Sequence, residues 1–384
     1  MAPWPVFGPD EIEASSRVLA SGKVNYWTGS EGRLFEEEFA RYVGTRHSVA
    51  LTNGTVALEL ALRALGIGPG DEVILTPRSF VASASAIVLQ GATPIFADVD
   101  LESGNITCET IDEKISPRTR AILAVHLGGW PCDMPSIMEL ARKKNLKVVE
   151  DCAQAHGASV AGKKVGSFGD ISAWSFCQDK IMSTGGEGGM VTLDDSKDWE
   201  FCWSFKDHGK SYDAVHNREH APGFRWVHED FGTNWRLTEP QSAIGRCQLR
   251  KLDGWNVQRA ANAQILVEQL SDLLHFPVAG ANIEPVFYRL YGRMEPNLFK
   301  EDWNRERVIS ELGAVGIKVF SGSCCEMYLE KAFEKHNLRP AERLPNARRL
   351  GEQSIAFLVH PSIETRDMEL IADVARQVLV AAKR

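Results

Sequence analysis

The sequence predicts an α/β fold: a large domain built on a mainly parallel sheet, followed by a smaller α/β domain at the C-terminus. Short apolar runs rich in β-branched residues alternate with segments in which apolar residues recur at helical spacing. This alternation is typical of βαβ units with parallel strands. The length of 384 residues suggests two or three domains of ordinary size.

The predicted strands are short, apolar and rich in β-branched residues. In chain order they cover residues 48–53, 72–77, 94–98, 121–127, 147–152, 171–176 and 189–194. Helix-length stretches lie between several of them. Strands in this order, joined by helices, predict one largely parallel sheet.

Helices are predicted where apolar residues recur at helical spacing. Residues 56–65 form one, and Gly66 provides a C-terminal stop. Residues 135–145 form another, with proline at a position that the first helical turn tolerates. A long helix is predicted from Asp253 onward, and residues 305–315 form a helix that ends before a glycine.

The pattern changes near residue 252, where the long helix begins. We therefore predict a large domain over residues 1–251, with an N-terminal arm at 1–22, and a smaller domain over 252–384. Residues 216–228 are polar and irregular, so they are predicted to form a loop. Long loops in α/β proteins often carry function, although some are merely exposed.

The charge balance excludes some classes of partner. Lys and Arg number 43 against 51 Asp and Glu, which gives a formal net charge of −8. This predicts no bulk binding to nucleic acid or to an anionic membrane, because both need a basic surface. Eight cysteines without a CxxC pair favour free thiols in a reducing compartment. Since no signal peptide or membrane span is apparent, we expect a cytoplasmic protein.

Three predicted strand ends carry residues suited to ligand binding. Ligands of parallel sheets bind at the carboxyl ends of the strands. After the first strand, Asn53-Gly54-Thr55 leads into a helix, whose free N–H groups attract phosphate. A plain helix cap formed by Thr55 is the alternative.

The acidic pair Glu150-Asp151 closes the fifth predicted strand. A buried carboxylate is costly without a cationic partner. Cys152 and His156 are near enough in sequence to suggest a metal, but these residues do not match a zinc spacing, and we predict none. The cation of a bound cofactor is a second explanation, and a capping or salt-bridged carboxylate is a third.

Lys180 follows the sixth predicted strand and precedes the glycine-rich segment 184–189. Such a lysine can be held inside a site for imine chemistry, which requires an activated amine. The alternative is an ordinary solvent-exposed lysine. The glycines match neither a P-loop nor a dinucleotide-binding fingerprint, so a dehydrogenase is disfavoured.

Together, a phosphate cup, an acidic residue and a lysine at three strand ends match the needs of pyridoxal 5′-phosphate (PLP). This cofactor has one phosphate, one pyridine nitrogen that a carboxylate keeps protonated, and one aldehyde that a lysine amine can bind. PLP is therefore the predicted cofactor.

Several of these segments also resemble a known family. Residues 149–157 (VEDCAQAHG) are similar to the EDAAQAHG block of the DegT/DnrJ/EryC1/StrS sugar aminotransferases, which are fold-type I PLP-dependent enzymes. Residues 51–55 (LTNGT), 175–189 and 232–237 (GTNWRL) resemble three further blocks of that family. The resemblance covers most of the chain, from Gly29 to about Pro361.

The resemblance implies roles for individual residues. Lys180 would bind the cofactor covalently and carry protons, and Asp151 would pair with the pyridine nitrogen. Phe80 would stack on the cofactor ring, and Gln154 would approach its phenolic oxygen. The residues implied to hold the phosphate are Gly54, Thr55 and Ser175.

The resemblance further implies a homodimer in which both subunits build each active site. Asn234 would reach the phosphate from the other subunit. Asn53 stands where the family usually has serine, and Trp235 where it usually has tyrosine. These departures leave the identity of the sugar open.

The implied activity is transfer of an amino group from L-glutamate to C4 of a nucleotide-diphosphate 4-keto-6-deoxy sugar, in lipopolysaccharide or antibiotic sugar biosynthesis. Amination at C3, another fold-type I reaction and a non-catalytic PLP-binding sensor are the alternatives. Lys180 favours transamination, since related sugar 3-dehydratases carry histidine there. The substrate's diphosphate requires cations. The candidate substrate residues are His156, Lys206, Lys210, Arg218, Arg225 and Arg236.

Overall fold

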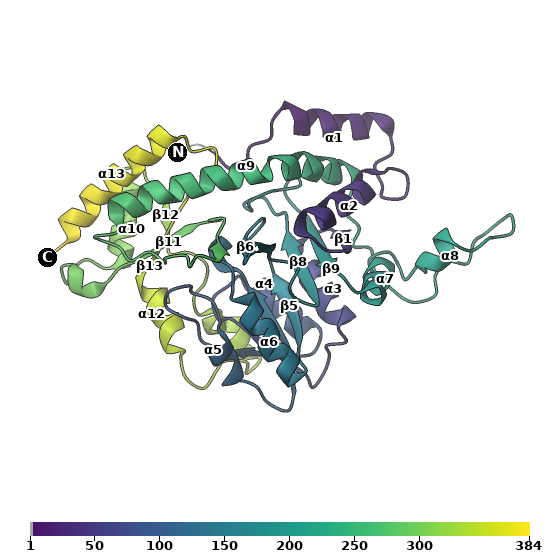
Figure 1. Cartoon of the computed structure of the whole chain (residues 1–384), viewed down its shortest axis with the longest axis horizontal. Helices are drawn as coiled ribbons and strands as arrows, with labels where there is room; N and C mark the ends of the chain where they lie inside the picture. The colour runs from purple at the N-terminus through teal and green to yellow at the C-terminus, as the bar shows by residue number, and fades with distance from the viewer. Residues whose placement is uncertain (1–2) are drawn as a thin grey trace.

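The computed structural model describes residues 3–384, and its helices and strands interleave through the large domain before one long helix leads into the small domain (Figure 1). The helices are α1 Pro9–Ser21, α2 Glu31–Val43, α3 Gly54–Ala64, α4 Ala82–Leu89, α5 Cys108–Asp112, α6 Met134–Lys144, α7 Ser196–Phe205, α8 Tyr212–His216, α9 Glu239–Leu270, α10 Arg305–Ala314, α11 Lys331–Lys335, α12 Pro345–Gln353 and α13 Thr365–Ala382, with short 3-10 turns at Leu127–Gly129, Pro296–Leu298 and Met327–Leu329. The strands are β1 His47–Leu51, β2 Glu72–Leu75, β3 Thr93–Phe96, β4 Thr119–Val125, β5 Lys147–Asp151, β6 Ser159–Val160, β7 Lys163–Lys164, β8 Ile171–Ser175, β9 Gly189–Leu193, β10 Ile283–Glu284, β11 Leu290–Arg293, β12 Val319–Phe320 and β13 Ser354–Phe357.

A seven-stranded sheet forms the centre of the large domain, in the order β1-β9-β8-β5-β4-β2-β3. β9 runs antiparallel to both of its neighbours, β1 and β8, and the other neighbouring strands pair in parallel. The mainly parallel sheet that the sequence predicts is therefore confirmed. Every strand except β9 points its carboxyl end toward the same edge, and this edge carries the candidate site.

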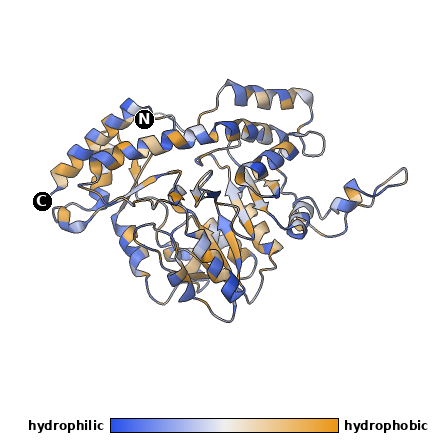
Figure 2. Ribbon diagram, in the orientation of Figure 1, coloured by the Kyte–Doolittle hydropathy of each residue, from blue (hydrophilic) through white to orange (hydrophobic). Residues whose placement is uncertain are grey.

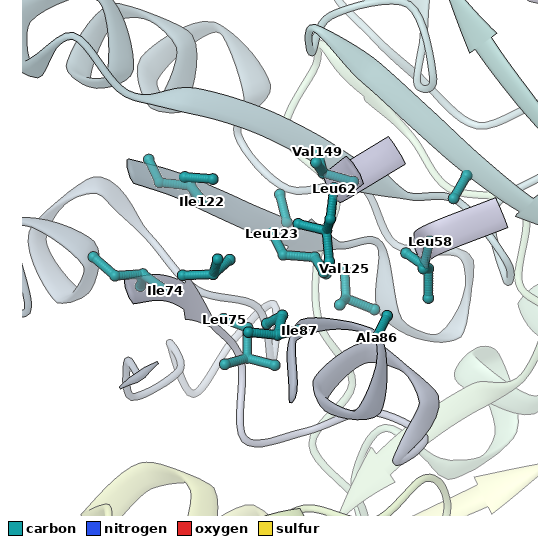
Figure 3. Close-up of a cluster of buried hydrophobic side chains, with 14 of the residues drawn as sticks. Leu58, Leu62, Ile74, Leu75, Ala86, Ile87, Ile122, Leu123, Val125 and Val149 are labelled. Atoms are coloured by element: carbon teal, nitrogen blue, oxygen red, sulfur yellow. The ribbon is translucent and has the colours of Figure 1, made fainter. Parts of the chain in front are cut away.

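Apolar residues cover both faces of the sheet. β2, β8 and β9 are buried along their full length, as expected when helices lie on both sides. Figure 3 shows Leu58 and Leu62 of α3 directed toward Leu123 and Val125 of β4. The outer helices carry both hydrophilic and hydrophobic residues (Figure 2), and no helix within residues 3–384 is long and apolar enough to cross a membrane.

The smaller domain has its own hydrophobic core. The three strands β11-β13-β12 pair antiparallel, and α10, α13 and the second half of α9 pack with them around buried apolar residues. α13 lies alongside α9 (Figure 1). α9 joins the domains, because its first half packs against α1 and α2 in the large domain.

α9 begins earlier than the sequence analysis predicts. The expected start was Asp253, whereas the helix begins at Glu239 and crosses the predicted boundary at residue 252 without a break. The start is marked by a capping box between Thr238 and Gln241 and by a proline in the first turn. Glu239 also has a tertiary role, since its buried carboxylate accepts the backbone N–H of Gly32 at 3.0 Å, at the start of α2.

Part of the predicted small domain packs onto the large one. Tyr328, Phe333 and Leu350 lie in the hydrophobic core of the large domain, although the predicted boundary assigned them to the small domain. The chain thus returns to the large domain between β12 and β13. Sequence pattern alone carries no sign of this return, because apolar spacing does not say which core a segment joins.

The loop expected at residues 216–228 extends from the large domain beyond α8 (Figure 1). His216 itself is the last residue of α8. Residues 217–231, after α8, form the projecting segment, and three of its aromatic side chains, Phe224, Trp226 and Phe231, are 75%, 84% and 94% exposed. Exposed aromatic residues grouped on one segment are typical of an interaction surface.

Glu150 and Asp151 are neighbours on β5, so their side chains point to opposite faces of the sheet. Glu150 is fully buried and its carboxylate is saturated with donors. These are His126 Nε2 at 3.1 Å, the Ser172 hydroxyl at 3.1 Å, and the backbone N–H groups of Gly166, Phe168 and Gly169 at 2.8–2.9 Å. Burial opposes its ionisation, but these donors outweigh burial and lower the pKa of Glu150. Glu150 is therefore a structural group.

We predict that Glu150→Gln lowers the free energy of unfolding by about 3 kcal/mol, because an amide NH2 would face donors that now meet an acceptor. Urea denaturation of the purified variant measures this loss. Glu139→Gln, at an exposed position of α6, is the control, with an expected change within about 0.5 kcal/mol. A Glu150→Gln protein as stable as the control would contradict the structural role.

Candidate active site

A cavity of about 570 Å³ opens at the carboxyl ends of the parallel strands. This volume lies in the usual range for small-molecule sites. The residues predicted for the site that line this cavity are Gly54, Thr55, Phe80, Asp151, Gln154, Ser175 and Lys180. They come from four separate segments of the large domain, so only the folded sheet brings them together.

One end of the cavity is built by the start of α3. Asn53, not Thr55, caps this helix, since the Asn53 side chain accepts the backbone N–H of Val56 at 3.0 Å. Thr55 is therefore free of the capping role considered from the sequence. A side chain at Gly54 would place its Cβ only 2.6 Å from the Cβ of Ser175, so glycine is required for the two segments to meet. Helix N–H groups, a small hydroxyl and an open cavity form an anion cradle.

Asp151 faces the cavity from the end of β5. Its carboxylate accepts the Ser83 hydroxyl at 2.8 Å and the backbone N–H of Ala153 at 3.1 Å. Burial raises the pKa of Asp151, although these two donors and the charge of Lys180 oppose the shift. Asp151 has no ion-pair partner within residues 3–384, because Lys180 pairs instead with Asp179.

Lys180 stands on the irregular segment between β8 and β9. Its amine lies 3.8 Å from the Asp179 carboxylate and 5.2 Å from the centre of the Tyr288 ring. The Tyr288 hydroxyl also donates to Asp179. Partial burial opposes ionisation of Asp179, but Lys180, Tyr288 and Arg289 outweigh it and lower the pKa of this carboxyl. The lysine is thus oriented by an ionised neighbour and is not a freely exposed lysine.

Gln154 and Phe80 complete the walls of the cavity. The Gln154 side-chain oxygen accepts the backbone N–H of Gly128 at 2.8 Å, so the amide NH2 is the end left to donate to a ligand. The Phe80 ring is 67% exposed at the rim of the cavity. A large aromatic ring in such a position offers a flat apolar face to a planar ligand.

The donor set of the cavity fits PLP. An anion cradle at Gly54 and Ser175 suits the phosphate, and the carboxylate of Asp151, which has hydrogen-bond donors but no cationic partner within residues 3–384, suits a protonated ring nitrogen. The amine of Lys180 suits an aldehyde. Phe80 adds a face for the ring between these ends.

Three predicted residues lie outside this cavity on the exposed surface. Asn234 is exposed beside the projecting segment, and its backbone pairs with Asp207. Arg225 lies on the projecting segment and donates to the backbone carbonyl of Val215 at 2.8 Å. Arg218, on the same segment, pairs with Asp213 at 2.6 Å. A single chain does not bring these residues to Lys180.

The expectation that Lys206 binds substrate is wrong. Lys206 is completely buried, its amine lies 2.6 Å from the Glu36 carboxylate, and the ring of Tyr26 covers it at 4.1 Å. Lys210 and Arg236 both pair with the buried carboxylate of Asp207, Lys210 at 2.9 Å. Each of these three cations is thus paired with a carboxylate, and none of the three cations lines the cavity.

His156 does not contact the cavity either. The ring is fully buried between Trp174 and Phe176, with ring centres 5.2 and 5.6 Å away. Burial, helped by the charge of Lys180, lowers the pKa of His156 to about 3, so the ring is neutral at physiological pH. A substrate-binding role by direct contact is therefore wrong for this residue. Its contacts with Trp174 and Phe176 make His156 part of the packed interior of the large domain.

One buried cluster has the residue types of a metal site. His126, Glu150 and Cys152 place ligand atoms within 4.8 Å of one another. However, His126 Nδ1 accepts the backbone N–H of Cys132 at 3.0 Å, so Nε2 carries the proton that Glu150 accepts. Burial also raises the pKa of the Cys152 thiol well above its usual value. The cluster is a satisfied hydrogen-bond network within the large-domain interior.

Sequence reasoning missed three residues of the site. Ser83 holds the Asp151 carboxylate, while Asp179 and Tyr288 orient the Lys180 amine. Asp179 could have been suspected, because it directly precedes the lysine. Ser83 and Tyr288 carry no sequence signal, since they reach the site from α4 and from the segment before β11.

Comparison with known proteins gives full-length matches. The chain is 37% identical over 352 residues to a UDP-N-acetyl-3-dehydro-α-D-glucosamine 3-aminotransferase of Acidithiobacillus ferrooxidans, covering 91% of this chain and 89% of the relative. It is 34% identical over 376 residues to a GDP-perosamine synthase of Escherichia coli O157:H7, covering 96% of each.

Solved structures give the same result. The X-ray structure of an aminotransferase from Psychrobacter cryohalolentis superposes with a TM-score of 0.98 at 50% identity, covering 99% of both chains. The model of the DegT/DnrJ/EryC1/StrS aminotransferase family matches residues 6–376, nearly the whole sequence. The resemblance noted in the sequence is thereby confirmed, and the chain belongs to the DegT/DnrJ/EryC1/StrS aminotransferase family.

Proposed function

We propose that this aminotransferase uses PLP to move an amino group from L-glutamate to a keto carbon of a nucleotide-diphosphate sugar. The observation that carries the proposal is one cavity lined by an anion cradle, a buried carboxylate without a cation and an oriented lysine. The relatives named for reactions of nucleotide sugars support the substrate class.

PLP, when bound, supplies an aldehyde that takes up amino groups and a ring that accepts the electron pair left by a departing proton. Gly54, Thr55 and Ser175 would hold its phosphate. Asp151 would keep the ring nitrogen protonated, since a buried carboxylate is stabilised by a positive partner. Phe80 would exclude water from one face of the ring.

Lys180 would carry the proton in both halves of the reaction. Its amine Nζ would take the proton from the α-carbon of the amino donor and deliver a proton when the keto sugar receives the nitrogen. Asp179 and Tyr288 limit the positions that this amine can adopt. A fixed amine close to the reacting carbon is the geometry that makes such transfer fast.

The diphosphate of the substrate needs cations that a single chain does not bring to the cavity. Arg225, on the projecting segment, is the remaining candidate. The other predicted cations each pair with a carboxylate: Lys206, Lys210, Arg218 and Arg236. The exposed rings of Phe224, Trp226 and Phe231 on this segment support a homodimer in which the segment reaches the partner's site. Asn234 would reach the partner's phosphate in the same assembly.

The position of amination has two candidates. The sequence resemblance favours C4 of a 4-keto-6-deoxy sugar. C3 is favoured by the name of the Acidithiobacillus relative, a 3-aminotransferase of a 3-dehydro sugar. Incubating the purified enzyme with L-glutamate and matched panels of 3-keto and 4-keto nucleotide sugars decides between them. Glutamate-dependent formation of 2-oxoglutarate without an amino sugar would contradict the nucleotide-sugar assignment. It would still agree with an aminotransferase that uses L-glutamate as the amino donor.

We predict that Lys180→Ala abolishes turnover and the visible absorbance of the cofactor–lysine link, because no other lysine of residues 3–384 lines the cavity. Lys180→Arg should behave in the same way, since a guanidinium does not form the link. Absorbance spectra and glutamate-dependent turnover measure both effects. Lys197→Ala, at an exposed position of α7, is the control. Near-normal turnover by Lys180→Ala would remove Lys180 from the mechanism.

Asp151→Asn should leave the protein folded and lower kcat by about 10²-fold or more, because an amide cannot hold a proton on the ring nitrogen by its charge. Near-ultraviolet circular dichroism checks the fold, and stopped-flow kinetics with glutamate measures the rate. In the variant the amide oxygen can still accept the Ala153 N–H, and the amide NH2 can donate to the Ser83 hydroxyl, which is free to donate to Ser79 instead, so stability should change little. Kinetics equal to those of the wild type would show that Asp151 has no electrostatic role.

Subunit complementation tests the shared site. Lys180→Ala and Asn234→Ala proteins should each have little activity, whereas a mixture that has exchanged subunits should recover about a quarter of the wild-type activity, because half of the dimers then contain one intact site. Activity assays before and after exchange measure the recovery. No recovery in a mixture that has exchanged subunits would mean that each chain builds its site alone.

A further inference from the structure

The N-terminal arm reaches the segment that carries Lys180. Trp4, which precedes α1, donates its indole N–H to the backbone carbonyl of Lys180 across 2.8 Å. An indole nitrogen can only donate, so the direction of this bond is fixed by chemistry. The two residues are 176 positions apart, and the bond is therefore made by the tertiary fold alone.

Trp4 is itself held on several sides. Its ring packs edge-on against Trp255 of α9, with ring centres 5.2 Å apart, and stacks on His360 at 6.0 Å. Burial, with nearby arginines, lowers the pKa of His360 to about 4, so the stacked ring is neutral. One residue earlier, the backbone carbonyl of Pro3 accepts the Ser362 hydroxyl at 2.7 Å. The ring is thus anchored by α9 and by the small domain together.

A buried arginine, Arg259, packs against the ring of Trp4. Arg259 of α9 is 1% exposed, and its Nε and Nη2 have no acceptor within residues 3–384. Its guanidinium lies over the Trp4 ring, 5.0 Å from the centre. The attraction between a cation and an aromatic face strengthens when both are shielded from water. Arg259 and Trp4 therefore fix each other.

The segment that carries Lys180 has no helix or strand of its own. Residues 176–188 connect β8 to β9, and inside this segment Lys180 N–H donates to the Cys177 carbonyl at 3.1 Å. That bond closes one turn but does not connect it to the rest of the molecule. The indole of Trp4 provides such a connection directly at the lysine backbone.

We infer that Trp4 is a positioning residue for Lys180: the anchored indole holds the lysine carbonyl and so fixes where the amine enters the cavity. The contact itself is independent of any reaction, and its catalytic consequence rests on the proposed function. The N-terminal arm is therefore part of the active-site construction, and the ring of Trp4 adds a second contact to the one that Tyr288 makes with Lys180.

The decisive variant is Trp4→Phe, which keeps an aromatic face for Arg259 and His360 but loses the N–H. Hydrogen–deuterium exchange of the protein without cofactor should be about tenfold faster over residues 176–184 and unchanged in the central strands. Val6→Ala, in the same arm and 44% exposed, is the matched control and should exchange like the wild type. Trp4→Ala removes ring and donor together, and if it fails to fold, Trp4→Phe alone decides.

With PLP added, Trp4→Phe should form the visible cofactor–lysine absorbance more slowly and with a shifted pH midpoint. Its kcat should fall about tenfold while KM for both substrates stays within about twofold, since binding groups are untouched. Wild-type exchange over residues 176–184, or an unchanged rate of PLP capture, would overturn the inference. The exchange measurement needs neither cofactor nor substrate, so it tests the contact even if the proposed function is wrong. Failure of the proposed function would show separately, because the wild-type protein would then bind no PLP.

Discussion

Asp151 stands at the end of a buried strand with its carboxylate turned toward the cavity, and hydroxyl and amide donors, but no cation, lie against it. Burying such a group is costly unless a positive partner arrives. The contrast with Glu150, one residue earlier, is instructive. Glu150 faces the other side of the sheet, where donors of the chain itself saturate it. The site is therefore the place where the fold leaves a charge for a ligand to satisfy.

The antiparallel strand β9 holds this site together. Gly189 at its start pairs with Leu51 of β1 on one side and with Ser175 of β8 on the other. A side chain at Gly189 would place its Cβ 2.2 Å from the backbone carbonyl of Asn53, so the close approach depends on glycine. This pairing brings the start of α3 next to the end of β8. The anion cradle is a consequence of that register.

The part of the site that contains Lys180, Asp151 and the anion cradle is built differently from the part expected to bind the substrate. The carboxylate and the cradle lie at the ends of buried strands, where small displacements are resisted by packing, and the lysine follows on the irregular segment after β8. The basic residues expected to meet the substrate are either paired with Glu36 or Asp207 inside the large domain or carried on the projecting segment beyond α8. A single chain thus brings the lysine, the carboxylate and the cradle together, and the proposed homodimer would complete the substrate side.

The alternation of strands and helices, the mainly parallel sheet and the residues at three strand ends could be predicted from the sequence, because period and local order decide these. Asp151 and Lys180 could be named for the same reason, since Asp151 closes one apolar run and Lys180 stands a few residues after another. Tertiary structure alone decided which charges stay unpaired: Lys206 looked like a free cation in a polar stretch, yet the fold buries it against Glu36. Trp4 lies 176 positions before its acceptor, and spacing along a sequence holds no information about such a contact. Pairing and burial depend on what folding places opposite each side chain, and only the packed molecule specifies that.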